Sequence, residues 1–131
     1  MAYETFIKYK EAVERDLKID QFNIHDKVNE IPSLKHFWVA KLIESKIEIK
    51  KLQKEKAALI KKLSEHSDIG IKLSTASMNN VISKSPVINE INEKIEELEL
   101  IVEYLEKAEK IFNSTTYDLK NAIELMKMES M

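Results

Sequence analysis

Residues Pro86–Met128 read "PVINEINEKIEELELIVEYLEKAEKIFNSTTYDLKNAIELMKM". Its apolar residues recur at alternating steps of four and three, the spacing of a helix that packs lengthwise against other helices. Ser85 and Pro86 form a helix-start signal, with serine as N-cap and proline at the first helical position. The sequence therefore predicts one long helix over residues 86–128.

This helix carries more apolar surface than one partner helix can cover. A second stripe lies beside the first and contains Ile101, Tyr104, Ala108, Ile111, Ala122 and Leu125. At 1.5 Å per residue the helix is roughly 65 Å long, whereas a compact chain of this size has a radius of gyration of about 14 Å. Two adjacent stripes on so long a helix require more than one neighbour, so we expect a homo-oligomer. The expected interface is the first stripe: Ile91, Ile95, Leu98, Val102, Leu105, Phe112, Leu119 and Ile123.

Two helices are predicted before it. Residues 3–17 place apolar side chains at three- and four-residue steps and form a shorter N-terminal helix. A connector follows, in which Asp20 is suited to cap a helical turn and Pro32 marks a boundary. Residues 33–64 repeat apolar positions with a period of about 3.5, which predicts the second long helix.

Residues 65–85 contain the only glycine of the chain, Gly70, and are rich in serine. This composition predicts a loop that can hold a short helix. Across all 131 residues there are one glycine, two prolines and no cysteine. The first two counts argue against a multi-stranded sheet, and the third fits a reducing cytosol. We therefore expect an all-α fold in a single helical domain over residues 1–131, without a signal peptide or membrane span.

The helix predicted over residues 33–64 carries a basic band. Seven lysines stand against two glutamates between Lys46 and Lys62, a net charge of +5, although the whole chain has a net charge of −2. On a helical wheel six of these lysines gather on one side: Lys46, Lys50, Lys51, Lys54, Lys61 and Lys62. The segment Glu90–Glu109 is the reverse, with a net charge of −6. The lysines either pair with this acidic segment beside a shared apolar seam or bind a phosphate backbone.

No motif indicates an enzyme. Three histidines are scattered without metal-ligand spacing: His25, His36 and His66. Phosphate-binding glycine loops and nucleophile elbows are absent from the sequence, so we expect no catalytic residues, no metal, no cofactor and no small-molecule substrate. Three aromatic side chains have the chemistry to stack on nucleobases: Phe37, Trp38 and Tyr117. Aromatic residues at helical spacing are more often core, and we expect this of Trp38.

Four segments resemble the UvsY recombination mediators of tailed phages. "DLKID" (Asp16–Asp20) is similar to the end of the family's N-terminal helix, and "IPSLKHFW" (Ile31–Trp38) with "KEKAALIKKL" (Lys54–Leu63) is similar to its basic helix. The closest match is "YLEKAEKIFNSTTYDLKNAIELMKM" (Tyr104–Met128). After the basic helix the family often has a tyrosine pair and a glycine, whereas this chain has "SEHSDIG" (Ser64–Gly70). That departure makes the expected DNA contact more purely electrostatic.

The resemblance implies a non-enzymatic function. It implies a ring or barrel of helical subunits that binds single-stranded DNA and helps load a phage recombinase onto strands covered by single-strand-binding protein. The place of action it implies is the cytoplasm of the infected bacterial host. With the resemblance, we interpret the six lysines as the DNA-binding residues. The alternative function is a structural or chaperone-like coiled-coil assembly protein without a nucleic-acid role.

Overall fold

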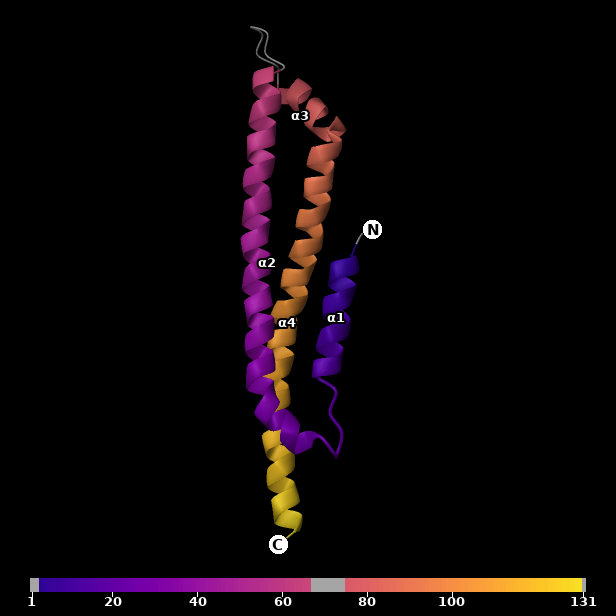
Figure 1. The fold of residues 1–131 in the computed structure, drawn as a ribbon, viewed down its shortest axis with the longest axis vertical. Coiled ribbons are helices and arrows are strands. Elements are labelled where there is room, and N and C mark those ends of the chain that lie inside the picture. Colours follow the sequence, from indigo (N-terminus) through magenta and orange to yellow (C-terminus); the bar gives the residue numbers. More distant parts are fainter. Residues whose placement is uncertain (1–2, 67–74, 131) are drawn as a thin grey trace.

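The computed structural model describes residues 3–66 and 75–130, and within these ranges it consists of four helices without a strand. They are α1 (Glu4–Asp16), α2 (Ile24–His66), α3 (Thr75–Lys84) and α4 (Pro86–Glu129). The long helices α2 and α4 lie side by side and antiparallel, and α1 packs along α4 (Figure 1). The predicted all-α fold class is confirmed.

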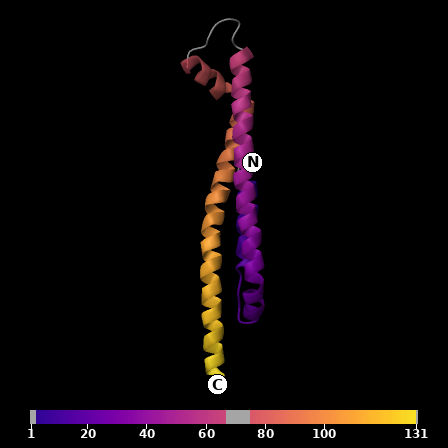
Figure 2. The same cartoon turned by 90° about the vertical axis from the view of Figure 1, so that its left-hand side faces the viewer.

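The two long helices are staggered. The C-terminal end of α4 extends past the start of α2, and α3 lies at the opposite end of the molecule (Figures 1 and 2). The described part of the predicted 65–85 loop thus contains the short helix α3. Gly70 lies outside the described residues. No helix in the described ranges has both the length and the apolar character that crossing a membrane requires.

The predicted start of the second long helix was wrong. α2 begins at Ile24, so that Pro32 lies inside the helix. A proline in a helix interior removes a backbone hydrogen bond and costs about 3 kcal/mol. The neighbouring Ile31 is almost fully buried in the core, and burying a side chain of this size contributes about 1.5–3 kcal/mol. Tertiary packing of the first two turns therefore offsets the proline.

The other helix ends follow local chemistry. The Asp20 carboxylate accepts hydrogen bonds from the backbone N–H groups of Phe22 and Asn23, at 2.8 and 3.0 Å, and turns the chain into α2. The Ser85 hydroxyl accepts a bond of 3.3 Å from the backbone N–H of Ile88. Pro86 then opens α4, as the sequence predicted.

The main core lies where three helices meet. The indole of Trp38 on α2 contacts Tyr9 on α1 edge to face, with ring centroids 5.7 Å apart. One turn earlier on α1, Phe6 makes a similar contact of 5.5 Å with Tyr104 on α4. The buried members of this core are Val13, Ile31, Trp38, Leu42, Ile101, Leu105, Ala108, Phe112 and Leu119. A smaller cluster, formed by Leu52, Ile91 and Ile95, joins α2 and α4 further along.

Candidate nucleic-acid interface

The basic band is exposed on α2. All six lysines of the band have exposed side chains, whereas Leu42 and Leu52 of the same helix are buried against the core. The apolar seam therefore orients the helix, and the lysines face solvent because they lie on its other sides. The members are Lys46, Lys50, Lys51, Lys54, Lys61 and Lys62.

Only one lysine of the band pairs with the acidic helix. The Lys46 ammonium lies 3.4 Å from a Glu106 carboxylate oxygen on α4. Both side chains are about half exposed, and an ion pair of this kind contributes about 0–1 kcal/mol. Among the described residues, the other five lysines of the band make no ion pair. Pairing within the chain thus accounts for Lys46 alone.

Apart from Glu106, the glutamates of α4 between Glu90 and Glu109 make no ion pair with α2 within the described residues. Glu90 pairs with Lys94 at 3.6 Å and Glu103 with Lys107 at 3.3 Å, in each case one turn apart on α4 itself. The remaining glutamates between Glu90 and Glu109, apart from Glu106, make no ion pair within the described residues. A basic and an acidic surface therefore coexist on one subunit, joined by the single ion pair between Lys46 and Glu106.

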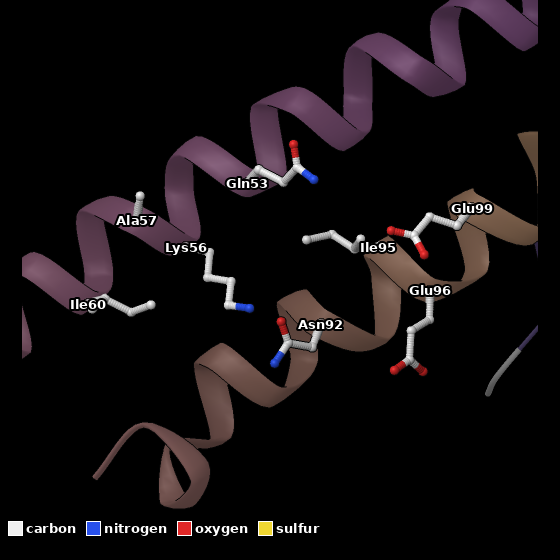
Figure 3. A pocket seen from close by; sticks show the side chains of 8 residues that line it. All are labelled: Gln53, Lys56, Ala57, Ile60, Asn92, Ile95, Glu96 and Glu99. Atoms are coloured by element: carbon white, nitrogen blue, oxygen red, sulfur yellow. The ribbon is translucent and has the colours of Figure 1, made fainter. Parts of the chain in front are cut away.

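The seventh lysine of the basic segment has a different environment. Lys56 is half-buried and extends into a space between α2 and α4, on the side of Asn92 (Figure 3). This open cavity has a volume of about 480 Å³. Glu96 and Glu99 also line it. Lys56 occupies a seam position of the heptad pattern, where an apolar side chain would normally fill the space between the helices. The two helices are therefore less tightly packed here than in the main core.

The predicted interface stripe lies largely inside the subunit. Ile91 and Ile95 pack against Leu52 of α2, and Leu105, Phe112 and Leu119 belong to the main core. Leu98, Val102 and Ile123 are half-buried. All of them except Ile123 pack within the chain's own two clusters, and the assignment of the stripe to an interface between copies stays a prediction.

The aromatic candidates have different environments. Trp38 is buried, as expected for a core residue, and its Nε1 is bonded to Asp16. Phe37 is half exposed, contacts Trp38 edge to face and has the Lys41 ammonium 5.4 Å from its ring centre. Tyr117 is exposed on α4. Only Phe37 and Tyr117 are therefore accessible to a ligand.

Two features of the surface were not identified from the sequence. Lys41 packs over Phe37, and its i, i+4 spacing could have indicated this contact. Ile43 and Ile47 are apolar yet exposed on α2, one turn apart beside the lysines.

His25 and His36 are exposed, and no group of three potential metal ligands occurs among the described residues.

Comparison with known proteins places this surface in context. The model of the family described as "Recombination, repair and ssDNA binding protein UvsY" matches residues 12–131. Two crystal structures of the bacteriophage T4 recombination mediator protein UvsY resemble the chain. The lattice type IV structure has a TM-score of 0.77 at 17% identity, covering 93% of this chain and 96% of that chain. For lattice type II the TM-score is 0.75 at 17% identity, with 95% and 96% covered.

No curated protein matches the chain by sequence. At 17% identity the two crystal structures show a shared fold. The family match extends over nearly the whole chain, from the end of α1 through α4, and it supports a recombination mediator role. By this match, the chain belongs to the UvsY family.

Proposed function

We propose that the chain binds single-stranded DNA without sequence specificity and helps load a phage recombinase onto strands covered by single-strand-binding protein. It acts as a homo-oligomer in the cytoplasm of the infected bacterial host, without a cofactor or a small-molecule substrate. The exposed lysines of α2 hold the phosphates. The family description, which includes recombination, repair and ssDNA binding, supports this role.

One observation carries the proposal. Five lysines of the band are exposed and make no ion pair within the described residues: Lys50, Lys51, Lys54, Lys61 and Lys62. Ammonium groups that are not neutralised by the protein release counterions when they bind phosphates, and this release favours binding. Contacts to phosphates carry no sequence information. A band of this kind fits a protein that must accept any single strand.

Oligomer formation would strengthen the binding. A single band makes few phosphate contacts, but its repetition around an assembly raises the effective concentration of binding sites along one strand. The same strand would then be held in an extended path on the protein surface. Presenting the strand in this form to the recombinase is the step that we assign to the mediator.

The salt dependence of binding tests the proposal. A labelled single-stranded oligonucleotide is titrated with protein at about 50 and 200 mM salt, and anisotropy is measured. Five phosphate contacts with a single strand predict a fall in affinity of about 100-fold over this range. Preference for the single strand over a duplex of the same length is expected. Absence of binding at the lower salt concentration would refute the proposal.

The alternative is a structural or chaperone-like coiled-coil assembly protein. The pair between Lys46 and Glu106 favours it, because it joins the basic and acidic helices through charge. That alternative predicts the same oligomer but no anisotropy change with DNA at either salt concentration. The titration therefore separates the two functions.

A further inference from the structure

A groove lies between α1 and α2, next to the contact between Tyr9 and Trp38. Its volume is about 620 Å³, which is in the range of small-molecule sites. Most of its surface is apolar, as is usual for a site that binds an organic ligand. The apolar and aromatic members of the lining are Tyr9, Ala12, Leu34, Phe37 and Trp38.

Phe37 is the accessible aromatic ring of this groove. Tyr9 is half-buried and Trp38 is only 4% exposed, so these two rings belong to the floor. The Phe37 ring remains 49% exposed although Trp38 and the Lys41 ammonium both contact it. A flat aromatic ligand that packs against the free part of the ring would remove apolar surface from water.

The charged groups of the lining balance one another. Two are cationic and two are anionic: Lys8, Arg15, Glu11 and Asp16. The Asp16 carboxylate is bonded to Nε1 of Trp38, and beside the groove Lys41 pairs with Glu44 at 3.3 Å. A lining without net charge suits a neutral aromatic ring better than a phosphate. Nucleobases are neutral aromatic rings.

The cations at the rim suit the backbone on either side of such a base. Lys8 and Arg15 are exposed, and neither makes an ion pair within the described residues. Arg15 is the only arginine of the chain, and a guanidinium group is suited to phosphate contacts. A base in the groove would therefore have a cation available for a flanking phosphate.

Phe37 and the lysine band are parts of one helix. Lys51 follows Phe37 by 14 residues on α2, a distance of roughly 21 Å along the axis. Two exposed carboxylates, Glu44 and Glu48, lie between them, and Glu44 is paired with Lys41. The groove is thus a separate subsite, and its contribution to binding does not depend on the density of lysines.

Such a subsite supplies what the lysine band lacks. Both a single strand and a duplex present phosphates, and contacts to phosphates do not read the bases. Only unpaired bases can leave the stack and pack against aromatic side chains. Preference for the single strand therefore requires a surface that accepts a base.

We propose that the groove between α1 and α2 accepts one unstacked nucleobase of the strand whose phosphates the α2 lysines hold, with Phe37 as the packing ring. Arg15 contacts a flanking phosphate at the rim. Every base has an aromatic face, so this contact does not select a sequence. The inference rests on the DNA binding of the proposed function and names the element that distinguishes a single strand from a duplex.

Two oligonucleotides of equal length separate the base contact from the phosphate contacts. One is oligothymidylate, and the other has the same phosphates but abasic sugars. At about 50 mM salt the wild type should bind oligothymidylate at least about fivefold more tightly, as measured by anisotropy. Trp38 lines the groove and is the only tryptophan. Its fluorescence should fall with oligothymidylate and stay unchanged with the abasic strand.

Phe37→Ala assigns the base contact to the groove. This variant should lose at least about fivefold in affinity for oligothymidylate and keep its affinity for the abasic strand. The slope of log affinity against log salt should not change, because no phosphate contact is removed. Phe37→Tyr keeps an aromatic ring and should keep the preference. The matched control is Phe22→Ala, which removes an 86% exposed phenylalanine outside the groove and should bind like the wild type.

The outcomes that would overturn the inference are distinct from those that concern the proposed function. A wild type that binds both oligonucleotides equally tightly keeps its phosphate contacts and has no base subsite. Equal losses in Phe37→Ala and Phe22→Ala, or an equal loss on the abasic strand, would also overturn it. The comparison of the two strands on the wild type decides the matter even if far-ultraviolet circular dichroism shows that Phe37→Ala loses helix. A wild type that binds neither strand would refute the proposed function itself.

Discussion

The indole Nε1 of Trp38 donates a hydrogen bond of 2.8 Å to Oδ2 of Asp16, and this bond joins the end of α1 to α2. The Lys27 ammonium donates a second bond, of 2.9 Å, to the backbone carbonyl of Asp16. The carboxylate therefore holds the indole of the buried Trp38 in place. It explains why an aspartate stands at the end of an otherwise apolar helix face.

Replacing this acceptor should destabilise the protein. Asp16→Ala leaves the buried indole N–H of Trp38 without an acceptor, which costs about 1–3 kcal/mol. The midpoint of urea unfolding should fall accordingly. Because Trp38 is the only tryptophan, its fluorescence follows the transition directly. Asp16→Asn retains an acceptor oxygen and should lose less stability, so an equal loss in both variants would contradict this account.

The far end of the basic band should carry DNA affinity. Lys61→Ala with Lys62→Ala removes two exposed ammonium groups, so the slope of log affinity against log salt should become less steep by about 1.4 for a single strand. Sedimentation of the free protein should not change. The matched control is Lys107→Ala with Lys110→Ala on α4. If the control weakens binding as much, the effect is one of overall charge and the band is not the site.

Local signals in the sequence were sufficient for some elements. Ser85 and Pro86 predicted the start of α4 because capping depends only on adjacent residues. The length of α4 could be predicted because the apolar period that marks a long helix is contained in the sequence of that helix alone. The start of α2 was missed for the opposite reason. Pro32 is a boundary signal by itself, and what overrides it is the burial of Ile31 against residues far away in the sequence.

The candidate site divides in the same way. The lysine band could be predicted because six lysines on one side of a helix require only the helix period. The ion-pair partners of the lysines could not be predicted. Lys46 and Glu106 are 60 positions apart in the sequence, and their pairing depends on how the two long helices are aligned. An apolar stripe does not reveal whether the chain itself or another copy covers it. Ile91 and Ile95 are covered by α2, whereas the exposed Ile43 was not identified.

Pro32 provides a direct test of where α2 begins. In a helix interior a proline costs about 3 kcal/mol, and less than about 1 kcal/mol of this is offset by the restriction of the unfolded chain. Pro32→Ala should therefore raise the free energy of unfolding by about 2 kcal/mol, measured by urea denaturation. Pro86→Ala at the first position of α4 is the control and should bring no gain. No gain at Pro32 would mean that the helix starts after it.

Tyr104 should make the fold sensitive to alkaline conditions. Burial raises the pKa of its phenol above the usual value of 10.0, and the nearby Glu14 carboxylate acts in the same direction. Above pH 10 the tyrosine ionises in the unfolded chain before it does so in the folded one, so the folded state binds more protons. The free energy of unfolding must then fall as pH rises from about 10 through the folded pKa.

Tyr104→Phe should remove this part of the alkaline loss. The phenylalanine ring can keep the edge-to-face contact with Phe6, so stability at pH 8 should change little. Urea midpoints at about pH 8 and 10.5 are compared for the variant and the wild type, and the variant should lose less between the two. Lysines and the other tyrosines contribute equally to both proteins, so the comparison isolates position 104. Equal losses in Tyr104→Phe and the wild type would show that Tyr104 is not responsible. Tyr117→Phe, at an exposed position of α4, is the control, and the same reduction of the alkaline loss in this variant would also contradict the assignment.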